Sequence, residues 1–262
     1  MKWTAATADA VRRPRGLVIL IYHRVGARTP VSVDLPRPLF AEQLAALAAG
    51  WAPVTLDDAA RLLAGPAAPP GPPPVCLTFD DGTADFVEEA LPELVAQRIP
   101  ATLYVATDHI DAGRPFPDDG RPVSWAGLRD ALSTGLVTIG SHTHTHRLLD
   151  RVAGPEAAAE LDRSIGLIED RLGVECRHFA YPKALLGSPA AEQEVRRRFR
   201  TAAIAGTRPN PYGRSDPHRL RRSPVQVTDG MRWFRRKAAG GMALEDDLRA
   251  LRNRRRYAGT VT

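Results

Sequence analysis

Short apolar runs alternate along this chain with segments of helical periodicity, and this alternation limits the folds open to it. The apolar runs are rich in β-branched residues and read as strands, several of them buried on both faces. We expect strands at 16–23, 51–55, 75–79, 101–106, 137–139, 177–180, 201–205 and 219–227. We expect helices at 39–49, 56–63, 86–97, 124–132, 154–172 and 190–199.

Strands that alternate with helices predict a mostly parallel α/β sheet with right-handed crossovers. About seven strands fit either a barrel or an open sheet. In both folds, polar residues at the carboxyl ends of the strands gather on one face, where chemistry takes place. The polar residues found at such ends are His23, Asp80 with Asp81, His142 with His146, and Tyr181.

Three of the seven histidines stand at alternating positions, 142, 144 and 146, just after the strand predicted at 137–139. We expect Gly140 and Ser141 to end that strand. On a helical turn His142 and His146 would share a face, and on an extended segment all three would. Either arrangement permits a metal site, and a solvated histidine-rich loop is the alternative. A catalytic metal also needs a third protein ligand.

The sequence Asp80-Asp81-Gly82 ends another buried strand and can supply that ligand. Two adjacent carboxylates repel each other, and a bound divalent cation would relieve the repulsion. We expect Asp81 to join His142 and His146 as metal ligands, with Asp80 as the general base for water. The alternative for these residues alone is a simple turn in which aspartate caps the next helix.

Composition agrees with one large α/β domain. The chain has 262 residues, of which 44% are hydrophobic, and only two cysteines, Cys76 and Cys176, so no disulfide framework is expected. The run 17–22 is too short for a signal peptide or a membrane span, so we expect a cytoplasmic protein. Residues 192–262 hold 18 lysines and arginines against 7 acidic residues. We favour a solvated, arginine-rich surface as the interpretation of this charge, and a peripheral association with anionic lipid or a lipid-linked sugar is the alternative. No nucleic-acid motif accompanies the charge, and we expect no nucleic-acid partner.

The segment 78–82 (Thr-Phe-Asp-Asp-Gly), followed by 141–146 (Ser-His-Thr-His-Thr-His), resembles the first two signature motifs of the polysaccharide deacetylases. This is the NodB-homology group, or carbohydrate esterase family 4. Weaker similarity extends over the segments 22–25, 124–125 and 179–182. The resemblance implies a distorted, incomplete (β/α) barrel with about seven parallel strands, and hydrolysis of acetyl groups on sugars. It also implies a divalent metal, first zinc and otherwise cobalt, nickel or iron.

Position by position, the resemblance makes Asp80 the general base and Asp81, His142 and His146 the metal ligands. Thr143 matches a position that shapes the site, and His144 is not a predicted ligand. We expect His23, Tyr181 and Lys183 to contact substrate.

The chain departs from the family pattern in two places. In the third motif, Lys183 stands where the family has a tyrosine whose N–H completes the oxyanion hole, and Ala184 replaces a glycine. The late motif that supplies a catalytic histidine is not evident at 220–225, which leaves His23 as a candidate general acid, with a hydrogen-bonded core histidine as the alternative.

These observations predict an N-terminal extension (1–16), a catalytic domain (17–250) and a basic tail (251–262). The expected activity is the metal-dependent removal of N-acetyl groups from a sugar, glycoconjugate or polysaccharide. Two alternatives are an O-acetyl sugar esterase, which needs less help from a general acid, and a carbohydrate-binding protein that has lost turnover.

Overall fold

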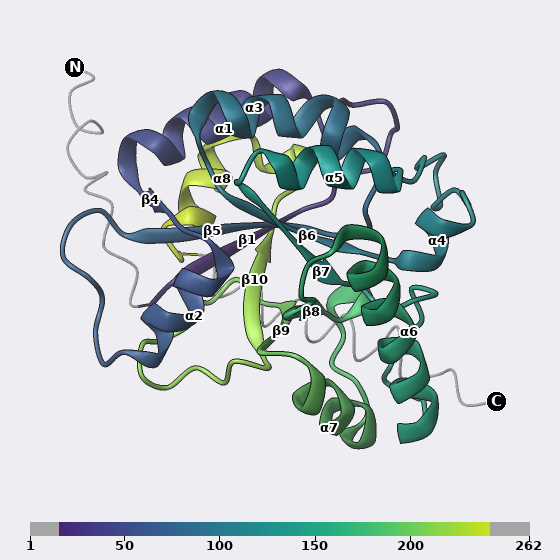
Figure 1. Ribbon diagram of the computed structural model, residues 1–262. Helices are drawn as coiled ribbons and strands as arrows, with labels where there is room; N and C mark the ends of the chain where they lie inside the picture. The colour runs from purple at the N-terminus through teal and green to yellow at the C-terminus, as the bar shows by residue number, and fades with distance from the viewer. Residues whose placement is uncertain (1–15, 242–262) are drawn as a thin grey trace, which may run out of the picture.

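The computed structural model describes residues 16–241, which form one α/β barrel (Figure 1). Seven parallel strands close into a ring in the order β1-β10-β9-β8-β7-β6-β5, and β5 returns to pair with β1. These strands are β1 (Val18–Tyr22), β5 (Pro74–Phe79), β6 (Ala101–Val105), β7 (Val137–Ser141), β8 (His178–Ala180), β9 (Thr201–Ala205) and β10 (Leu220–Pro224). The predicted fold class is confirmed; the ring has one strand fewer than a complete eight-stranded barrel.

Three short strands lie outside the ring. β4 (Ala52–Pro53) extends the sheet beyond β5, while β2 (Arg24–Val25) and β3 (Asp34–Leu35) pair with each other next to the end of β1. All the predicted strands are present. β7 continues through Gly140 and Ser141, however, so the expectation that these two residues break the strand was wrong.

Helices surround the ring and connect its strands (Figure 1). They are α1 (Arg37–Gly50), α2 (Leu56–Ala64), α3 (Leu91–Gln97), α4 (Thr107–Asp111), α5 (Trp125–Ser133), α6 (Gly154–Leu172), α7 (Pro189–Arg198) and α8 (Gly230–Ala238). A π-helical turn (Phe86–Ala90) runs directly into α3, and Pro92, which has no N–H to donate, follows this turn. The sequence analysis did not anticipate α4 and α8.

Apolar residues fill two separate regions because strand side chains alternate between the inside and the outside of the ring. The larger cluster lies between the strands and the outer helices, around Tyr22, Phe79 and Phe179. The smaller cluster fills the amino-terminal half of the barrel interior, where Ile19 and Cys76 meet Leu56 and Leu63 of α2. Helix α2 therefore plugs this end of the ring, and the opposite end is free to form a site.

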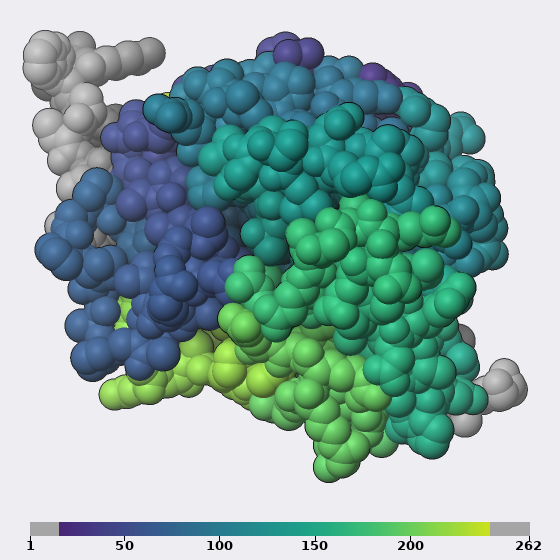
Figure 2. Space-filling view, in the orientation of Figure 1, coloured from purple at the N-terminus to yellow at the C-terminus, as the bar shows by residue number. Residues whose placement is uncertain are grey.

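Segments far apart in the sequence close the plugged end. Figure 2 shows α2 beside the yellow-green segment that precedes β10, and the Gly213 N–H donates to the Leu63 carbonyl at 2.8 Å. Among the described residues, no helix combines the length and hydropathy that a membrane span requires. The predicted extension, up to residue 15, and the predicted tail lie outside the described residues.

Candidate metal and active site

Two adjacent aspartates lie at the carboxyl end of β5. The Asp80 N–H donates to the Tyr22 carbonyl at 3.1 Å, so the ladder with β1 extends one residue beyond the strand. Asp80 has the same parity as Cys76 and Thr78 and therefore points into the ring. At Asp81 the backbone changes to the left-handed region, with φ of 75°, and Gly82 follows at φ of 91°. This reversal lets both neighbouring carboxylates reach one pocket.

His142 follows β7 directly and is held in one orientation. Its Nδ1 lies 2.7 Å from the Ala180 carbonyl, which can only accept, so Nδ1 carries the proton and Nε2 keeps its lone pair. Nε2 lies 3.6 Å from Asp81 Oδ1. A hydrogen bond from the far nitrogen is the usual way in which proteins orient a histidine that binds a metal.

His146 completes a group of three. Its Nε2 lies 3.3 Å from Asp81 Oδ1, and its ring centroid is 4.9 Å from that of His142. One donor atom from each of Asp81, His142 and His146 lies within 4.8 Å of the others. The three predicted metal ligands are therefore adjacent in space.

The segment that carries both histidines is neither helix nor strand. Thr143 and His146 have positive φ, 66° and 59°, and the Glu160 carboxylate of α6 accepts the N–H groups of His144 and Thr145 at 3.2 and 2.9 Å. This tight turn directs His144 away from the site. Its Nδ1 lies 2.9 Å from Thr107 Oγ1, and His144 is not part of the Asp81-His142-His146 group.

The protonation states suit a cation. Burial acts to raise the pKa of Asp81, but the hydrogen bond from His146 and the charges of His23 and His142 outweigh it and hold that pKa well below its ordinary value. Burial lowers the pKa of His142 to about 4. A carboxylate and neutral imidazoles are the forms that bind metals, and one oxygen with two nitrogens is a donor set that zinc and similar ions accept. The residues therefore fit a divalent cation.

Asp80 is held by a residue that the sequence analysis did not single out. Arg222 on β10 donates to both of its carboxylate oxygens, at 2.5 and 2.8 Å, and neither side chain is more than 4% exposed. Arg222 also donates to Thr78 Oγ1, and its guanidinium lies 5.0 Å from the centroid of the Tyr104 ring. Burial acts to raise the pKa of Asp80, but the charges of Arg222 and His142 outweigh it and keep Asp80 ionised.

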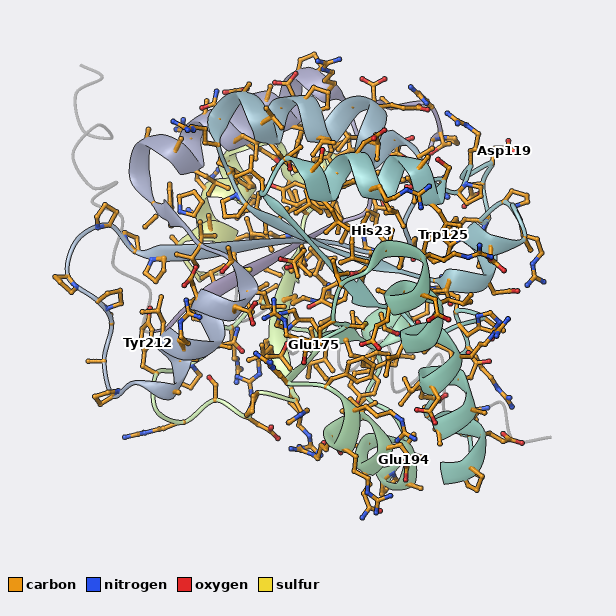
Figure 3. All side chains as sticks on the ribbon, viewed as in Figure 1. His23, Asp119, Trp125, Glu175, Glu194 and Tyr212 are labelled. Atoms are coloured by element: carbon orange, nitrogen blue, oxygen red, sulfur yellow. The ribbon has the colours of Figure 1, made fainter. Side chains whose placement is uncertain are left out.

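A pocket of about 630 Å³ opens above these groups. His23 lines it, and in Figure 3 this residue lies near the middle of the ring, whereas Tyr212 and Glu194 lie at the outer edge. His23 Nδ1 is buried and has no hydrogen-bond partner among the described residues. The alternative considered for His23, a hydrogen-bonded core histidine, would have a partner at this atom. This position keeps His23 among the candidate site residues.

The third-motif residues divide into two groups. Lys183 and Ala184 line the pocket, and both adopt left-handed backbone conformations, with φ of 55° and 54°. The Tyr181 side chain is fully buried against Phe179 and does not line the pocket, so its position gives no support to a contact with substrate.

The fold and the site together define an α/β-barrel protein with a candidate Asp-His-His metal centre at the carboxyl ends of its strands. A model of the polysaccharide deacetylase family matches residues 67–198, half of the chain, and the chain belongs to this family. A comparison with curated proteins gave no match.

Solved structures show the same fold. IcaB from Ammonifex degensii is 28% identical with a TM-score of 0.74, over 87% of this chain and 98% of IcaB. The deacetylase PplD of Streptococcus pyogenes, in complex with acetate, is 19% identical with a TM-score of 0.75, over 86% and 99%. The deacetylase domain of BpsB from Bordetella bronchiseptica is 24% identical with a TM-score of 0.64, over 80% and 95%. The last two bear on the fold alone.

Proposed function

We propose that this protein hydrolyses N-acetyl groups on a sugar, glycoconjugate or polysaccharide and that it depends on a divalent metal. One observation carries the proposal: the Asp81-His142-His146 group lies in a pocket beside a separate, arginine-bound carboxylate, Asp80. Family membership supplies the reaction class. Metal-dependent hydrolysis of an amide uses a Lewis acid and a base for water, and the two parts of this site would supply them.

Asp81, His142 and His146 would hold the cation, which when bound supplies a Lewis acid for the acetyl carbonyl and for water. Zinc is the ion we propose first, because two imidazoles and one carboxylate leave open positions of the kind found in catalytic zinc sites. Cobalt, nickel and iron are the alternatives to compare.

Asp80 would accept the proton of the attacking water. Arg222 occupies both of its oxygens from one side and so fixes the plane of the carboxylate towards the pocket. His23 lines the same pocket, so we propose that it delivers a proton to the departing amine.

The turn at Lys183 and Ala184 would hold the developing oxyanion. In the family this turn offers a backbone N–H, and the left-handed conformations of Lys183 and Ala184 support a tight turn here despite the replacement of tyrosine and glycine. The Lys183 ammonium, which is exposed at the pocket, adds a positive charge on the side where substrate enters.

Acetate release from a panel of N-acetylated saccharides tests the proposal, with the metal stripped from the protein and then restored. Activity should disappear with the metal and return with it. Asp81→Ala and His146→Ala should lose bound metal and activity together, while the matched control His144→Ala should retain both. Activity that survives in either ligand variant would refute the proposed site.

The same assay separates the two alternatives. Release from O-acetylated sugars but not from N-acetylated ones would indicate an esterase, because an alkoxide leaves more readily than an amine without a general acid. Saccharide binding with one metal per chain and no acetate release would indicate a protein that has lost turnover. The changed third motif is the feature that favours this last alternative.

Ion pairs hold part of the basic C-terminal third where the structure describes it. Arg196 and Arg219 both bind Glu192, at 2.7 Å in each case, and further ion pairs involve Arg198 and Arg200. On α8, by contrast, Arg232 and Arg236 lie over the exposed Trp233 ring, at 5.2 and 5.0 Å from its centroid. Aromatic and arginine side chains together suit an anionic membrane surface.

Helix α8 is therefore the surface we propose for any contact with anionic lipid or a lipid-linked sugar. Sedimentation with vesicles that contain phosphatidylserine should fall in Trp233→Ala and be absent with neutral vesicles. Equal sedimentation of both proteins would remove α8 from this role. No nucleic-acid partner is proposed, and the cytoplasmic location stays a prediction.

A further inference from the structure

One wall of the pocket is a loop, residues 112–121, whose inner residue packs against a metal ligand. Phe116 is 3% exposed and stacks on His109, with ring centroids 4.1 Å apart and an interplanar angle of 11°. The same ring meets His146 edge-on, at 6.4 Å and 90°. Phe116, Pro117 and Asp118 all line the pocket. The position of this wall loop therefore affects both the shape of the pocket and the surroundings of His146.

The opposite wall comes from the N-terminal part of the chain and is joined to the wall loop by one side chain. Val31, Ser32 and Val33, which lead into β3, line the pocket there. Arg24 on β2, which pairs with β3, donates to the Pro117 carbonyl at 2.6 Å and to the Asp118 carbonyl at 2.8 Å. Arg24 is 7% exposed, so these two hydrogen bonds lie in a partly dehydrated environment that strengthens them.

The sequence of the wall loop leaves space for this arginine. A Cβ atom on Gly120 would lie 2.1 Å from Arg24 Nη2 and 2.8 Å from its Cζ. Gly120 does not have positive φ, so its backbone conformation does not require glycine. The Gly120 carbonyl also accepts the Phe116 N–H at 2.7 Å, which closes the loop on itself. The missing side chain at 120 is thus explained by the guanidinium that fills its space.

Arg24 also separates two cavities. It lines the 630 Å³ pocket and a second cavity of about 310 Å³ on its other side, which Gly120 and Arg121 border. Figure 3 shows Asp119, beside this second cavity, at the periphery of the molecule. Without the guanidinium, the wall loop would lose its tie to β2 at the point where the two cavities meet.

We propose that Arg24 is a positioning residue that ties the two walls of the pocket together, holds Phe116 against His146 and sets the width available to a saccharide. The part of this proposal that concerns saccharides rests on the proposed deacetylase function; the tie itself does not. Arg24 sits directly after His23, so one strand end supplies both a pocket residue and the tie that closes the pocket around it.

Hydrogen exchange on the full, zinc-loaded chain tests the tie without any activity assay. In Arg24→Ala, amide exchange in residues 112–121 should become at least tenfold faster, because the loop opens more often. Gly120→Ala should give the same result while leaving the arginine in the sequence. Arg37→Ala is the matched control: this exposed arginine pairs with Glu89 and Glu93, which among the described residues form no ion pair with the loop, and its loss should leave exchange in the loop unchanged.

Unchanged exchange in Arg24→Ala and Gly120→Ala would overturn the proposal. Thermal unfolding of each variant identifies a chain that fails to fold, and because the two variants change different residues, one folded variant is sufficient for the test.

Steady-state kinetics then test the consequence for substrate. In both variants KM for an N-acetylated saccharide should rise at least fivefold, whereas kcat/KM for 4-nitrophenyl acetate, a small ester that does not span the walls, should stay within twofold. A parallel loss with both substrates would indicate a merely structural role and refute the positioning role. If the wild-type protein releases no acetate from any saccharide, the proposed function fails, and the exchange experiment still decides whether Arg24 ties the walls.

Discussion

Arg222 on β10 binds both carboxylate oxygens of Asp80, which follows β5, at 2.5 and 2.8 Å. Only β1 lies between these two strands in the ring, yet the two residues are 142 positions apart in the chain. A charged pair this deeply buried is seldom a net source of stability, but the loss of one partner is costly because the other charge stays buried. The geometry of the pair also fixes how Asp80 faces the pocket. Both consequences can be measured.

Replacing Arg222 with lysine should lower kcat by about 10- to 100-fold, because one ammonium cannot hold both oxygens of Asp80. Affinity for zinc, the ion proposed first, should change less than twofold, since the candidate ligands Asp81, His142 and His146 are untouched. Arg222→Met should also destabilise the fold by about 3–5 kcal/mol, because Asp80 would be left as a buried, unpaired charge. Turnover, zinc titration and denaturant unfolding give the three values. Arg221→Lys, at the exposed neighbouring position, is the control, and an equal loss there would exclude the specific pairing.

Replacing Gly140 with alanine should destabilise the barrel by about 1–3 kcal/mol, the usual cost of overpacking. A Cβ atom there would lie 2.7 Å from Tyr104 Cδ1 and 2.8 Å from the His178 carbonyl. Because the Tyr104 ring lies against Arg222, turnover should fall as well. The matched control is Gly166→Ala in α6, where a Cβ has open space and should add about 0.5–1 kcal/mol of stability. Equal effects at both sites would contradict the tight packing around Gly140.

Replacing Ala184 with glycine should stabilise the protein by about 1 kcal/mol, because Ala184 has φ of 54° and a side chain in that region costs about 1–2 kcal/mol. The same exchange at Ala190, in the first turn of α7, should have the opposite sign and cost about 0.5–1 kcal/mol. Chemical denaturation of the two variants measures both values. A destabilised Ala184→Gly protein would mean that the turn beside Lys183 is not left-handed.

Stability should fall as the pH drops below about 6.5, in part because of His178. This residue is buried at the plugged end of the barrel, with Nδ1 2.9 Å from Thr201 Oγ1 and Nε2 3.3 Å from Asp57 Oδ1. Burial lowers its pKa in the folded state, so below the ordinary histidine value of about 6.5 the unfolded chain binds a proton that the folded chain does not. Each such proton gives a slope of up to about 1.4 kcal/mol per pH unit.

The His178→Asn variant should therefore lose stability less steeply than the wild type between pH 6.5 and the lower folded-state pKa. The same exchange at His109, which lies at the other end of the barrel, is the control and should retain the wild-type slope. Denaturant unfolding across this pH range supplies the comparison. Parallel curves for wild type and His178→Asn would show that this imidazole does not contribute.

Much of the site follows from local patterns. A buried strand that ends in Asp80-Asp81-Gly82 and another that ends before His142 must meet at the same end of a parallel sheet, so the ligand group could be predicted without coordinates. The barrel closure does not follow from local patterns, because an open sheet and a ring share the same alternation of strands and helices; only the family resemblance implied a barrel. Only the pairing of β1 with β5 distinguishes them.

The missed features depend on contacts between distant parts of the chain. In the segment 220–224, Arg221 is exposed and Arg222 is buried, and nothing in the two adjacent arginines indicates which of them meets Asp80. Tyr181 stands at a strand end, as expected of a site residue, yet its side chain turns into the core. The buried residues of helix α8, Phe234, Lys237 and Ala238, have helical spacing. The sequence hides this apolar pattern because one of the three is a lysine, whose charge is paired with Asp229 in the folded protein.

The order of functional groups along the chain has a consequence for synthesis on the ribosome. Asp80, Asp81, His142 and His146 all precede α6, whereas the two groups that orient them, the Ala180 carbonyl and Arg222, follow it. A nascent chain that has emerged only through α6 contains all three candidate metal ligands, but it can neither fix the His142 ring nor hold Asp80. The site can be completed only once β10, the last strand of the ring to be translated, has been synthesised. If the chain were divided after α6, each half alone should be inactive. Activity would then appear only when the two halves reassociate, and it would measure that reassociation.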